Sequence, residues 1–266
     1  MIAILIIAIL YILCIMPRLF QRPDYTQFRS EQFAHRGFHN KDVKRPENSM
    51  SAFKMAVELG YGIELDVQLT KDNQVVVFHD FDLKRMCGIE KAVSECTYEE
   101  LLNFKLLDSE EQIPLLKDVL TLVEGKVSLL VELKCKNSKD NIAEQADKLL
   151  NKYEGRYYIE SFHPLALRWY KINRPEIIRG QLAECYERQK KVEQNIVFFL
   201  QQHLIFNFLC KPDFISYNWR HKKELSLNIC KYIFGAPTAA WTVRSQTELK
   251  KCESSFDAII FEQFYM

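Results

Sequence analysis

Several signatures of common protein classes are missing from this chain of 266 residues. It has no P-loop, no G-x-G-x-x-G phosphate loop and no zinc-finger spacing of cysteine and histidine, which argues against those nucleotide-binding and zinc-binding classes. It also lacks a long basic run, and 36 Lys and Arg against 35 Asp and Glu give a net charge of +1. The charge balance indicates no polyanionic partner, so nucleic-acid binding is not expected.

The eight cysteines form no C-x-x-C pair and no dense framework. This pattern is typical of free thiols in a reducing compartment rather than of a disulfide-stapled scaffold. A second linker is also missing from residues 32–266. With 48% hydrophobic and 27% charged residues, the chain has the composition of a globular enzyme, and we predict one continuous domain over 32–266.

The long uncharged run in the chain is at its N-terminus. Residues 1–16, MIAILIIAILYILCIM, carry no charged side chain, and as a helix they would span roughly 24 Å, slightly less than a bilayer core. Leu19 and Phe20 could extend this run. A signal peptide would need a positive start and a small-residue cleavage site, which are absent, so a short signal peptide is the lesser alternative. We therefore predict a transmembrane helix that anchors the chain over 1–20.

A polar link over 21–31 follows the predicted anchor. Arg18, Arg22 and Arg29 all lie on the C-terminal side of the apolar run. Positive flanks of a membrane helix stay inside the cell, so we predict a single-pass membrane protein whose catalytic domain faces the cytoplasm.

Short apolar or β-branched runs recur along the rest of the chain with helical patterns between them. The predicted strands cover 32–36, 62–67, 127–134, 157–162, 177–183, 213–218, 238–243 and 257–261. The predicted helices lie near 46–60, 113–125, 140–152, 164–174, 187–209, 221–234 and 245–253. Eight alternating units predict an α/β fold, a TIM-like (β/α)8 barrel without a full-length closing helix. A doubly wound open sheet is the alternative, but it gives no reason for acids on three strands to converge.

One segment departs from simple alternation. A Lys-Asp-Asn turn separates the second strand from VVVFHD, residues 75–80, which predicts a β-hairpin. The hairpin would bring His79 near Glu64 and Asp66. Residues 82–112 are charged and lack a clear core period, so we predict a short insertion over the barrel mouth.

The residues at the C-terminal strand ends are rich in ionisable groups, and function sits at that face in barrels of this class. They are His35, Arg36, Glu64, Asp66, Glu132, Lys134, Glu160, Tyr217 and Trp241, joined by His79 from the hairpin. Glu64 and Asp66 are two residues apart on one strand, so they share a face and repel unless a cation lies between them. With Glu132 they could form an oxygen cage for Mg²⁺ or Ca²⁺.

The cationic and imidazole groups predict what the metal site would act on. Arg36 and Lys134 suit phosphate oxygens. A metal, two cations and two histidines together indicate phosphodiester cleavage, in which His35 and His79 would transfer the protons.

The segment from residue 35 to 85 resembles the glycerophosphodiester phosphodiesterase family. It contains, in order, His-Arg-Gly, Pro-Glu-Asn, Glu-x-Asp-Val, a Thr-x-Asp turn and a closing His-Asp. The later motifs VELK, ESFHP, AWTV and DAII continue the family order, at residues 131–134, 160–164, 240–243 and 257–260. The chain departs from the family pattern at Ser49, where threonine is usual, and at the ending FEQFYM, which lacks the usual polar close.

The resemblance implies a role for each matching position. Glu64, Asp66 and Glu132 would hold one divalent cation, Mg²⁺ or Ca²⁺, and His35 and His79 would form the acid/base pair. Arg36 and Lys134 would bind the phosphate, and Trp241 would line the alcohol side. The implied reaction is hydrolysis of a glycerophosphodiester to glycerol 3-phosphate and an alcohol, directly or through a cyclic phosphate.

Other functions and roles remain open at this point. The first is a barrel phospholipase D-like enzyme that acts on lysophospholipids or lipid head groups at the membrane; the second is a membrane-tethered binding module without turnover. Glu160 is interpreted as a hydrogen-bond partner of the site rather than a ligand, and Trp241 as core packing almost as readily as a substrate wall. The remaining histidines are interpreted as structural or surface residues: His39, His163, His203 and His221.

Overall fold

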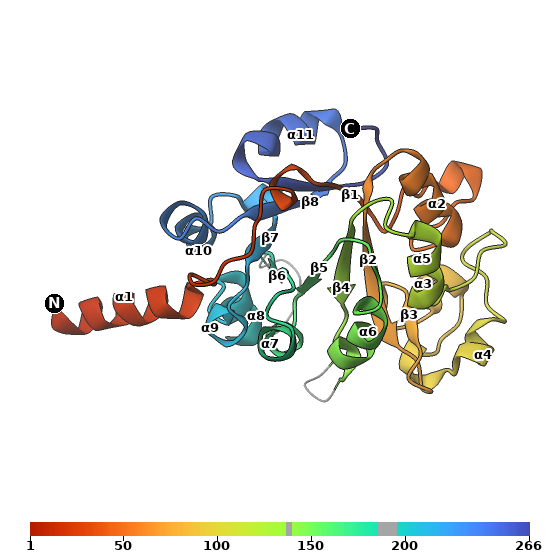
Figure 1. Ribbon diagram of the computed structural model, residues 1–266, viewed down its shortest axis with the longest axis horizontal. Coiled ribbons are helices and arrows are strands. Elements are labelled where there is room, and N and C mark those ends of the chain that lie inside the picture. Colours follow the sequence, from red (N-terminus) through yellow and green to blue (C-terminus); the bar gives the residue numbers. More distant parts are fainter. Residues whose placement is uncertain (137–139, 186–195) are drawn as a thin grey trace.

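The computed structural model, which describes residues 1–136, 140–185 and 196–266, is built around a closed barrel of parallel strands (Figure 1). Strand β1 pairs with β2 on one side and β9 on the other, which closes the ring. The parallel strands are β1 Gln32–His35, β2 Gly62–Leu69, β4 Leu129–Leu133, β5 Tyr157–Ser161, β6 Arg179–Ala183, β7 Phe214–Asn218, β8 Thr238–Val243 and β9 Ala258–Phe261. Each predicted strand overlaps one of these, so the predicted barrel is confirmed.

Helices lie around the outside of the barrel (Figure 1). In the described residues they are α1 Ile2–Ile15, α2 Met50–Glu58, α3 Lys84–Cys87, α4 Tyr98–Leu101, α5 Leu116–Val123, α6 Ile142–Leu150, α7 Pro164–Asn173, α8 Ile196–Gln202, α9 Asn207–Cys210, α10 Leu225–Asn228 and α11 Gln246–Cys252. Local chemistry explains several helix starts. Pro164 is the first residue of α7, and the hydroxyls of Ser49 and Ser245 accept backbone N–H bonds at the starts of α2 and α11.

Two predicted helices are shorter than expected. Within the predicted helix 187–209, the described part holds α8 and α9, and residues 187–195 lie outside the described residues. The predicted helix 221–234 is instead α10 followed by a π-helical turn, η5 (Ile229–Ile233). In 225–234, LSLNICKYIF, apolar residues continue on both sides of the change from α-helix to π-helix, so their pattern did not mark where regular α-helix stops.

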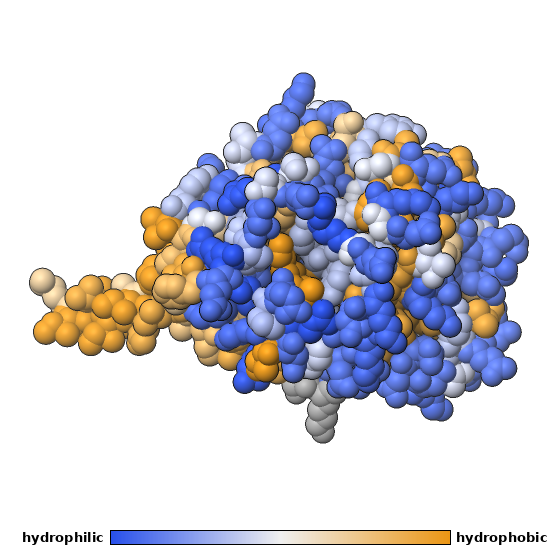
Figure 2. Space-filling view, in the orientation of Figure 1, coloured by the Kyte–Doolittle hydropathy of each residue, from blue (hydrophilic) through white to orange (hydrophobic). Residues whose placement is uncertain are grey.

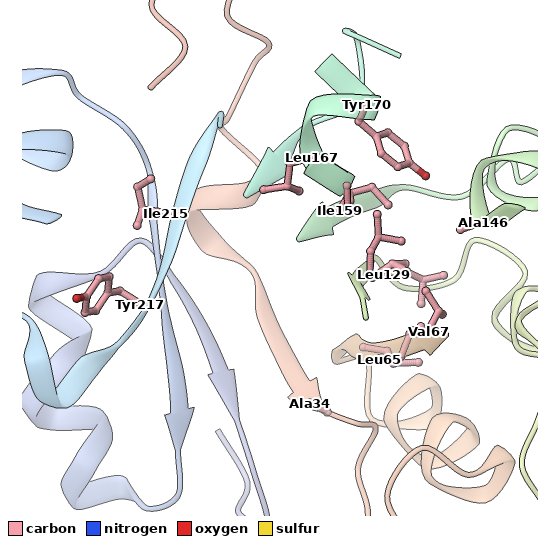
Figure 3. Close-up of a cluster of buried hydrophobic side chains, with 14 of the residues drawn as sticks. Ala34, Leu65, Val67, Leu129, Ala146, Ile159, Leu167, Tyr170, Ile215 and Tyr217 are labelled. Atoms are coloured by element: carbon pink, nitrogen blue, oxygen red, sulfur yellow. The ribbon is translucent and has the colours of Figure 1, made fainter. Parts of the chain in front are cut away.

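Side chains that point outward from the barrel form the main hydrophobic core. Ile159 of β5 lies beside Leu167 and Tyr170 of α7 in this core, which also contains Leu65 and Val67 of β2 (Figure 3). Because strand side chains alternate in direction, the residues between them must point into the barrel. Each strand therefore contributes one set of side chains to the contact with the helices and the alternate set to the interior of the barrel.

The interior of the barrel has a separate, aromatic core near the beginnings of the strands. Phe33, Tyr158 and Phe214 point into it from three strands, together with Phe28. Phe28 comes from a short 3-10 turn, η1 (Phe28–Ser30), and its ring lies 4.3 Å from the Phe214 ring and 5.1 Å from the Tyr158 ring between centroids. The segment predicted as a polar link over 21–31 thus closes the N-terminal end of the barrel.

The predicted β-hairpin is confirmed. Strand β3 (Val75–Val77) runs antiparallel to β2, with Val67 opposite Val77 and Leu69 opposite Val75. The insertion after it differs from the prediction, because it has a small core of its own. Val76 and Phe78 of the hairpin pack there with apolar residues of the insertion: Leu83, Met86, Val93, Cys96, Leu101 and Leu106. Its turns are too short to give one sequence period.

The predicted transmembrane helix is not supported. Helix α1 has 14 residues, which is roughly 21 Å at the rise of an α-helix. No helix in the described residues is both long and apolar enough to cross a bilayer. Pro17 explains the end of α1, because a proline forces the preceding residue, here Met16, out of helical geometry. The chain then turns back, and the N–H of Arg18 donates to the carbonyl of Pro212 at 2.9 Å.

Candidate active site

Carboxylates gather inside the barrel near the C-terminal ends of the strands, above the aromatic core. The strand register places His35 opposite Glu64, Asp66 opposite Glu132, and Glu132 opposite Glu160. One oxygen each from Glu64, Asp66 and Glu132 lies within 4.8 Å of the others, and all three side chains are buried. The structure brings together the three acids that the sequence singled out.

These acids fit a hard divalent cation. Burial, together with the neighbouring charges of Asp66, Glu160 and Glu132, holds the pKa of Glu64 well above its ordinary value. Asp66 Oδ1 is buried and has no hydrogen-bond partner among the described residues. Oxygens in this number and at this separation are the ligands that Mg²⁺ and Ca²⁺ prefer, and a cation would offset their repulsion.

Two cationic side chains lie directly against the acids. Lys134 Nζ is 3.1 Å from Glu132 Oε1 and 3.6 Å from Asp66 Oδ1, and Arg36 Nε is 3.4 Å from Asp66 Oδ2. Burial alone would raise the pKa of Asp66, but His79, Lys134 and Arg36 bring it below its ordinary value. Both predicted phosphate-binding residues are therefore at the site, where in this structure they pair with carboxylates.

The imidazole of His35 has one nitrogen fixed and one free. Nδ1 lies 3.1 Å from Glu262 Oε2, and Nε2 lies 4.0 Å from Glu64 Oε2. A carboxylate only accepts hydrogen bonds, so Nδ1 donates to Glu262 and the neutral ring keeps a lone pair on Nε2. Burial, followed by the Arg36 charge, lowers the pKa of His35 to about 4. The ring is neutral at pH 7 and can accept a proton at Nε2.

The second histidine is held in the same way. His79 Nδ1 lies 2.6 Å from Asp80 Oδ1, which leaves Nε2 free. Asp80 Oδ2 accepts from Arg85 Nε at 2.6 Å, Arg85 Nη2 donates to Glu47 Oε1 at 2.7 Å, and Arg36 Nη1 donates to the same oxygen at 2.7 Å. Burial would raise the pKa of Asp80, but the hydrogen bonds from His79 and Arg85 lower it below its ordinary value. A chain of hydrogen bonds thus connects His79 to Arg36.

The backbone around Arg36 is shaped for the site. Arg36 has φ +56°, and its N–H donates to Glu64 Oε2 at 2.9 Å. Asn48, with φ +54°, donates from Nδ2 to Asp66 Oδ2 at 2.9 Å. Asparagine adopts this left-handed conformation more readily than most residues. Two acids of the cluster are therefore oriented by local backbone geometry.

Sequence reasoning missed five residues of this arrangement, namely Glu47, Asn48, Asp80, Arg85 and Glu262. The first three lie within the Pro-Glu-Asn and His-Asp motifs, so a signal for them was present. Arg85 lies in the insertion, and Glu262 lies in the ending FEQFYM, which was interpreted as lacking a polar close. Nothing local marks either one, because each meets its partners only through the tertiary fold.

The remaining candidates divide between the site and the core. Trp241 points inward and packs edge-on against Phe162 at 5.7 Å between ring centroids, and its Nε1 is buried without a partner among the described residues. Glu160 is buried beside Glu132, and its Oε2 has no hydrogen-bond partner among the described residues. Tyr217 is different, because it belongs to the outward core and donates to the carbonyl of Gln202 at 2.9 Å.

Four histidines were interpreted as structural or surface residues. Among the described contacts, one of the four, His39, lies beside Glu262. His39 is buried, with Nε2 3.7 Å from Glu262 Oε1. His163 contributes to a groove between α6 and α7. His203 lies 3.7 Å from Glu224, and His221 ends the 3-10 turn after β7. His39 is therefore the histidine whose position sequence reasoning undervalued.

Comparison with known proteins agrees with this geometry. A protein-family model described as the glycerophosphoryl diester phosphodiesterase family matches residues 35–263. A glycerophosphodiester phosphodiesterase of Bacillus altitudinis is 40% identical over 145 residues, which are 49% of this chain and 57% of that protein. The mouse (Mus musculus) lysophospholipase D GDPD1 is 31% identical over 202 residues, which are 71% of this chain and 58% of that protein. The chain thus spans little more than half of these two relatives.

Solved structures share the barrel. A glycerophosphodiester phosphodiesterase from Thermotoga maritima has a TM-score of 0.63 and 27% identity, over 87% of this chain and 94% of that one. A phosphodiesterase from Oleispira antarctica, solved with the product sn-glycerol-3-phosphate, has a TM-score of 0.70 over 88% of this chain and 94% of that one. At 21% identity the second likeness shows the fold alone.

Proposed function

Because this chain belongs to the glycerophosphoryl diester phosphodiesterase family, we propose that it hydrolyses glycerophosphodiesters to glycerol 3-phosphate and an alcohol. One observation carries the proposal. Three buried carboxylates lie together, and each of the two histidines has its Nδ1 bonded to a further carboxylate. The glycerophosphodiester phosphodiesterase of Bacillus altitudinis, which is 40% identical over the matched residues, supports the same substrate class for this chain.

Glu64, Asp66 and Glu132 would hold one divalent cation, Mg²⁺ or Ca²⁺. When bound, the cation would offset the negative charge that develops on the phosphate oxygens. Arg36 and Lys134 would bind the remaining phosphate oxygens. Their donor atoms lie within 4 Å of Asp66, so both side chains are already at the site and would turn from this carboxylate toward the phosphate. Trp241 would form an apolar wall for the alcohol, next to Phe162.

The two histidines would transfer the protons of the reaction, one as the base and the other as the acid. His35 Nε2 accepts a proton from the nucleophile, which is water or the neighbouring glycerol hydroxyl of the substrate. As the new P–O bond forms, the P–O bond to the alcohol breaks, and His79 donates a proton to the leaving oxygen. With the hydroxyl as nucleophile, a cyclic phosphate forms first and water opens it. Glu262 and Asp80 hold the rings so that Nε2 of each faces the substrate.

A second candidate function is removal of the head group from lysophospholipids. One observation favours it, because α8 presents exposed apolar side chains close to the substrate side of the barrel. Phe199 of α8 is 56% exposed, and Gln201 of the same helix donates to the carbonyl of Phe162 at 2.7 Å. Phe162 in turn contacts Trp241. A lipid chain could therefore lie along α8 while its head group enters the site, as the name of the mouse relative suggests for that protein.

Membrane localisation with the barrel in the cytoplasm stays part of this proposal. Its basis is the group of arginines after the apolar N-terminal run. Arg18 pairs with Asp213 at 3.3 Å, and Arg29 pairs with Asp257. These arginines therefore also stabilise the attachment of the N-terminal segment to the barrel. A topology assay with a protease or a thiol reagent on sealed cells would test whether the barrel faces the cytoplasm.

The full chain, purified in detergent, would be incubated with glycerophosphocholine, glycerophosphoethanolamine and lysophosphatidylcholine, each with EDTA, Mg²⁺ or Ca²⁺. We expect glycerol 3-phosphate and free alcohol from the soluble diesters only when a divalent cation is present. Lysophosphatidic acid from the lysolipid alone would favour the second candidate. If the folded protein hydrolysed none of the three substrates, both enzymatic functions would be contradicted, and the hypothesis of a binding module without turnover would be favoured.

A further inference from the structure

Exposed apolar side chains concentrate on one side of the molecule, where α1 leaves the barrel. Most of α1 is exposed. Ile15 is the one residue of this helix that is buried, and the side chains of Ile2, Ile4 and Ile7 are each at least 66% exposed. Figure 2 shows this helix projecting from the molecule, with further hydrophobic surface on the barrel at its base. Patches of this size on a soluble surface usually mark a binding site.

The hydrophobic surface at the base of α1 comes from four neighbouring segments. We call it the collar, and it consists of Phe20, Ile196, Phe199, Phe208, Leu225, Tyr232 and Ile233, which are between 45% and 84% exposed. Two contacts at Ile15 place two of these segments, α9 and η5, against α1. The Ile15 carbonyl accepts from Asn207 Nδ2 of α9 at 2.7 Å and lies 3.3 Å from Cys230 Sγ of η5. Figure 1 shows α8, α9 and α10 on the side of the barrel from which α1 leaves.

The same surface is basic. Residues 196–235 contain five Lys and Arg but two Asp and Glu, an excess of three positive charges. One of the two acids, Asp213, is buried and paired with Arg18 and Arg179. Beside the collar, a groove of about 340 Å³ is lined by Lys222, Lys223, Lys231 and Tyr232, among others. None of the residues that line this groove is acidic, so the charge that the groove offers to a partner is positive.

We propose that α1 and the collar together form a lipid-binding face, and that its occupant is a bilayer with anionic head groups. Helix α1 is roughly 21 Å long, more than half of a hydrocarbon core of about 30 Å, so it enters from one side while the collar meets the surface. Lysines at the rim then lie at head-group level, where each contributes to attraction by anionic lipids. Aromatic Tyr232 suits the same level.

A second copy of this chain is a poorer occupant. In a two-fold symmetric dimer through this face, the lysine-rich rims would lie against each other, and like charges would repel. A bilayer with anionic lipids complements both properties of the face at once. The inference goes beyond the proposed reaction, because it concerns where the barrel sits and does not depend on which diester is cleaved.

The first test measures binding of the full chain to vesicles of phosphatidylcholine, with and without phosphatidylglycerol, by flotation. We expect the wild type to float with both, and more strongly with the anionic lipid at low salt. The variant Leu225→Glu/Ile233→Glu should bind roughly tenfold or more weakly, because a charged side chain would have to be buried where an apolar one is buried in the wild type. Leu102→Glu is the matched control, since Leu102 is an exposed leucine (41%) in the insertion, outside the collar.

A second test does not depend on how strongly α1 alone binds. Phe199→Trp places a fluorophore in the collar, and Leu102→Trp places one in the insertion. In vesicles with brominated lipid, we expect additional quenching for Phe199→Trp relative to the wild type and none for Leu102→Trp. Quenching of neither probe, with the protein bound to vesicles, would show that the collar stays out of the lipid and would overturn the proposal.

The activity assay separates this proposal from the proposed function. Leu225→Glu/Ile233→Glu should hydrolyse soluble glycerophosphodiesters at the wild-type rate, because in the described contacts neither residue touches the acids or histidines of the site. If the wild type fails to float and instead forms a dimer that this variant abolishes, the occupant is a second copy and the lipid proposal is wrong.

Discussion

At the residue scale, Glu262 shows how one carboxylate organises a site. It accepts from His35 Nδ1 at 3.1 Å, pairs with Arg244 at 3.1 Å and lies 3.7 Å from His39. Burial would raise its pKa, but the hydrogen bond and charges of these neighbours lower it to about 2. The group is an anion throughout the neutral range, so it holds His35 in one tautomer.

Replacing Glu262 with glutamine should therefore slow turnover without weakening substrate binding. The amide can donate to Nδ1, which would place the ring proton on Nε2, where the lone pair is needed. We expect kcat to fall by about a hundredfold, within the usual range for general acid–base catalysis, with KM almost unchanged. Steady-state kinetics on glycerophosphocholine would measure both.

Glu262→Asp is the matched control for this prediction. It keeps the charge and the acceptor, so kcat should recover in part. A rise in KM with unchanged kcat in Glu262→Gln would contradict a role through His35 and point to a role in binding.

The acid cluster gives a second prediction at this scale. Removing one charge from the crowded group, as in Glu64→Gln or Glu132→Gln, should abolish metal-dependent hydrolysis without unfolding the barrel. Mg²⁺ or Ca²⁺ should raise the Tm of the wild type, because ligands that bind only the folded state stabilise it, and should leave the Tm of either variant unchanged. Thermal melts with EDTA and with each metal would measure this effect.

Asp72→Asn serves as the control for the cluster, since Asp72 lies in the hairpin turn and bonds to Thr70 and Tyr98. That variant should keep both activity and the metal-induced rise in Tm. Full activity in Glu64→Gln or Glu132→Gln would remove the oxygen-cage hypothesis.

At the scale of elements, the start of α2 connects folding to the site. Ser49 Oγ accepts from the Ala52 N–H at 3.2 Å and donates to the Pro46 carbonyl at 2.6 Å. The residues between Pro46 and Ser49 are Glu47 and Asn48, which contact Arg36 and Asp66. The helix cap therefore fixes the turn from which two site residues extend.

Ser49→Ala should destabilise the protein by about 1 kcal/mol, the usual effect of losing an N-cap side chain. It should also lower kcat/KM, because the turn that carries Glu47 and Asn48 loses its anchor. Ser49→Thr, which keeps the hydroxyl, should behave nearly as the wild type. Urea denaturation and kinetics on both variants would measure this, and equal effects of alanine and threonine would contradict the capping role.

At the scale of the whole molecule, the barrel is stabilised by separate cores on its two faces. The outward core joins strands to helices, and the smaller inward core is aromatic and lies near the strand beginnings. The acids occupy the inward positions at the other end of the strands. Apolar packing thus supports the cluster from below and from outside, which allows several buried charges to be held close together.

Phe28 tests this description, because it fills the inward core from a segment outside the barrel. Phe28→Ala should reduce the free energy of unfolding by about 3–5 kcal/mol, the range for truncating a buried phenylalanine. Phe20→Ala, in the same segment but 84% exposed, should change it by about 0.5 kcal/mol or less. Urea denaturation of both would decide, and a small effect at Phe28 would show that the segment does not seal the barrel.

The sequence by itself determined the barrel, the hairpin and the central site residues. The strand and helix periods are local properties of the chain, and the spacing of Glu64 and Asp66 fixes their common face whatever surrounds them. The motifs from His35 to Asp80 are continuous in sequence, so they could be recognised there. The predicted membrane-spanning helix is not supported, because α1 ends at Ile15 ahead of Pro17, a proline that was visible in the sequence.

Only the tertiary structure decided which distant groups meet. Glu262 reaches His35 because β9 closes the ring against β1, and Arg85 reaches Glu47 because the insertion folds onto its own small core. Tyr217 lies at a strand end like the site residues, yet the barrel turns it outward. Closure and side-chain direction depend on all eight strands at once, and for that physical reason a local pattern could not reveal these contacts.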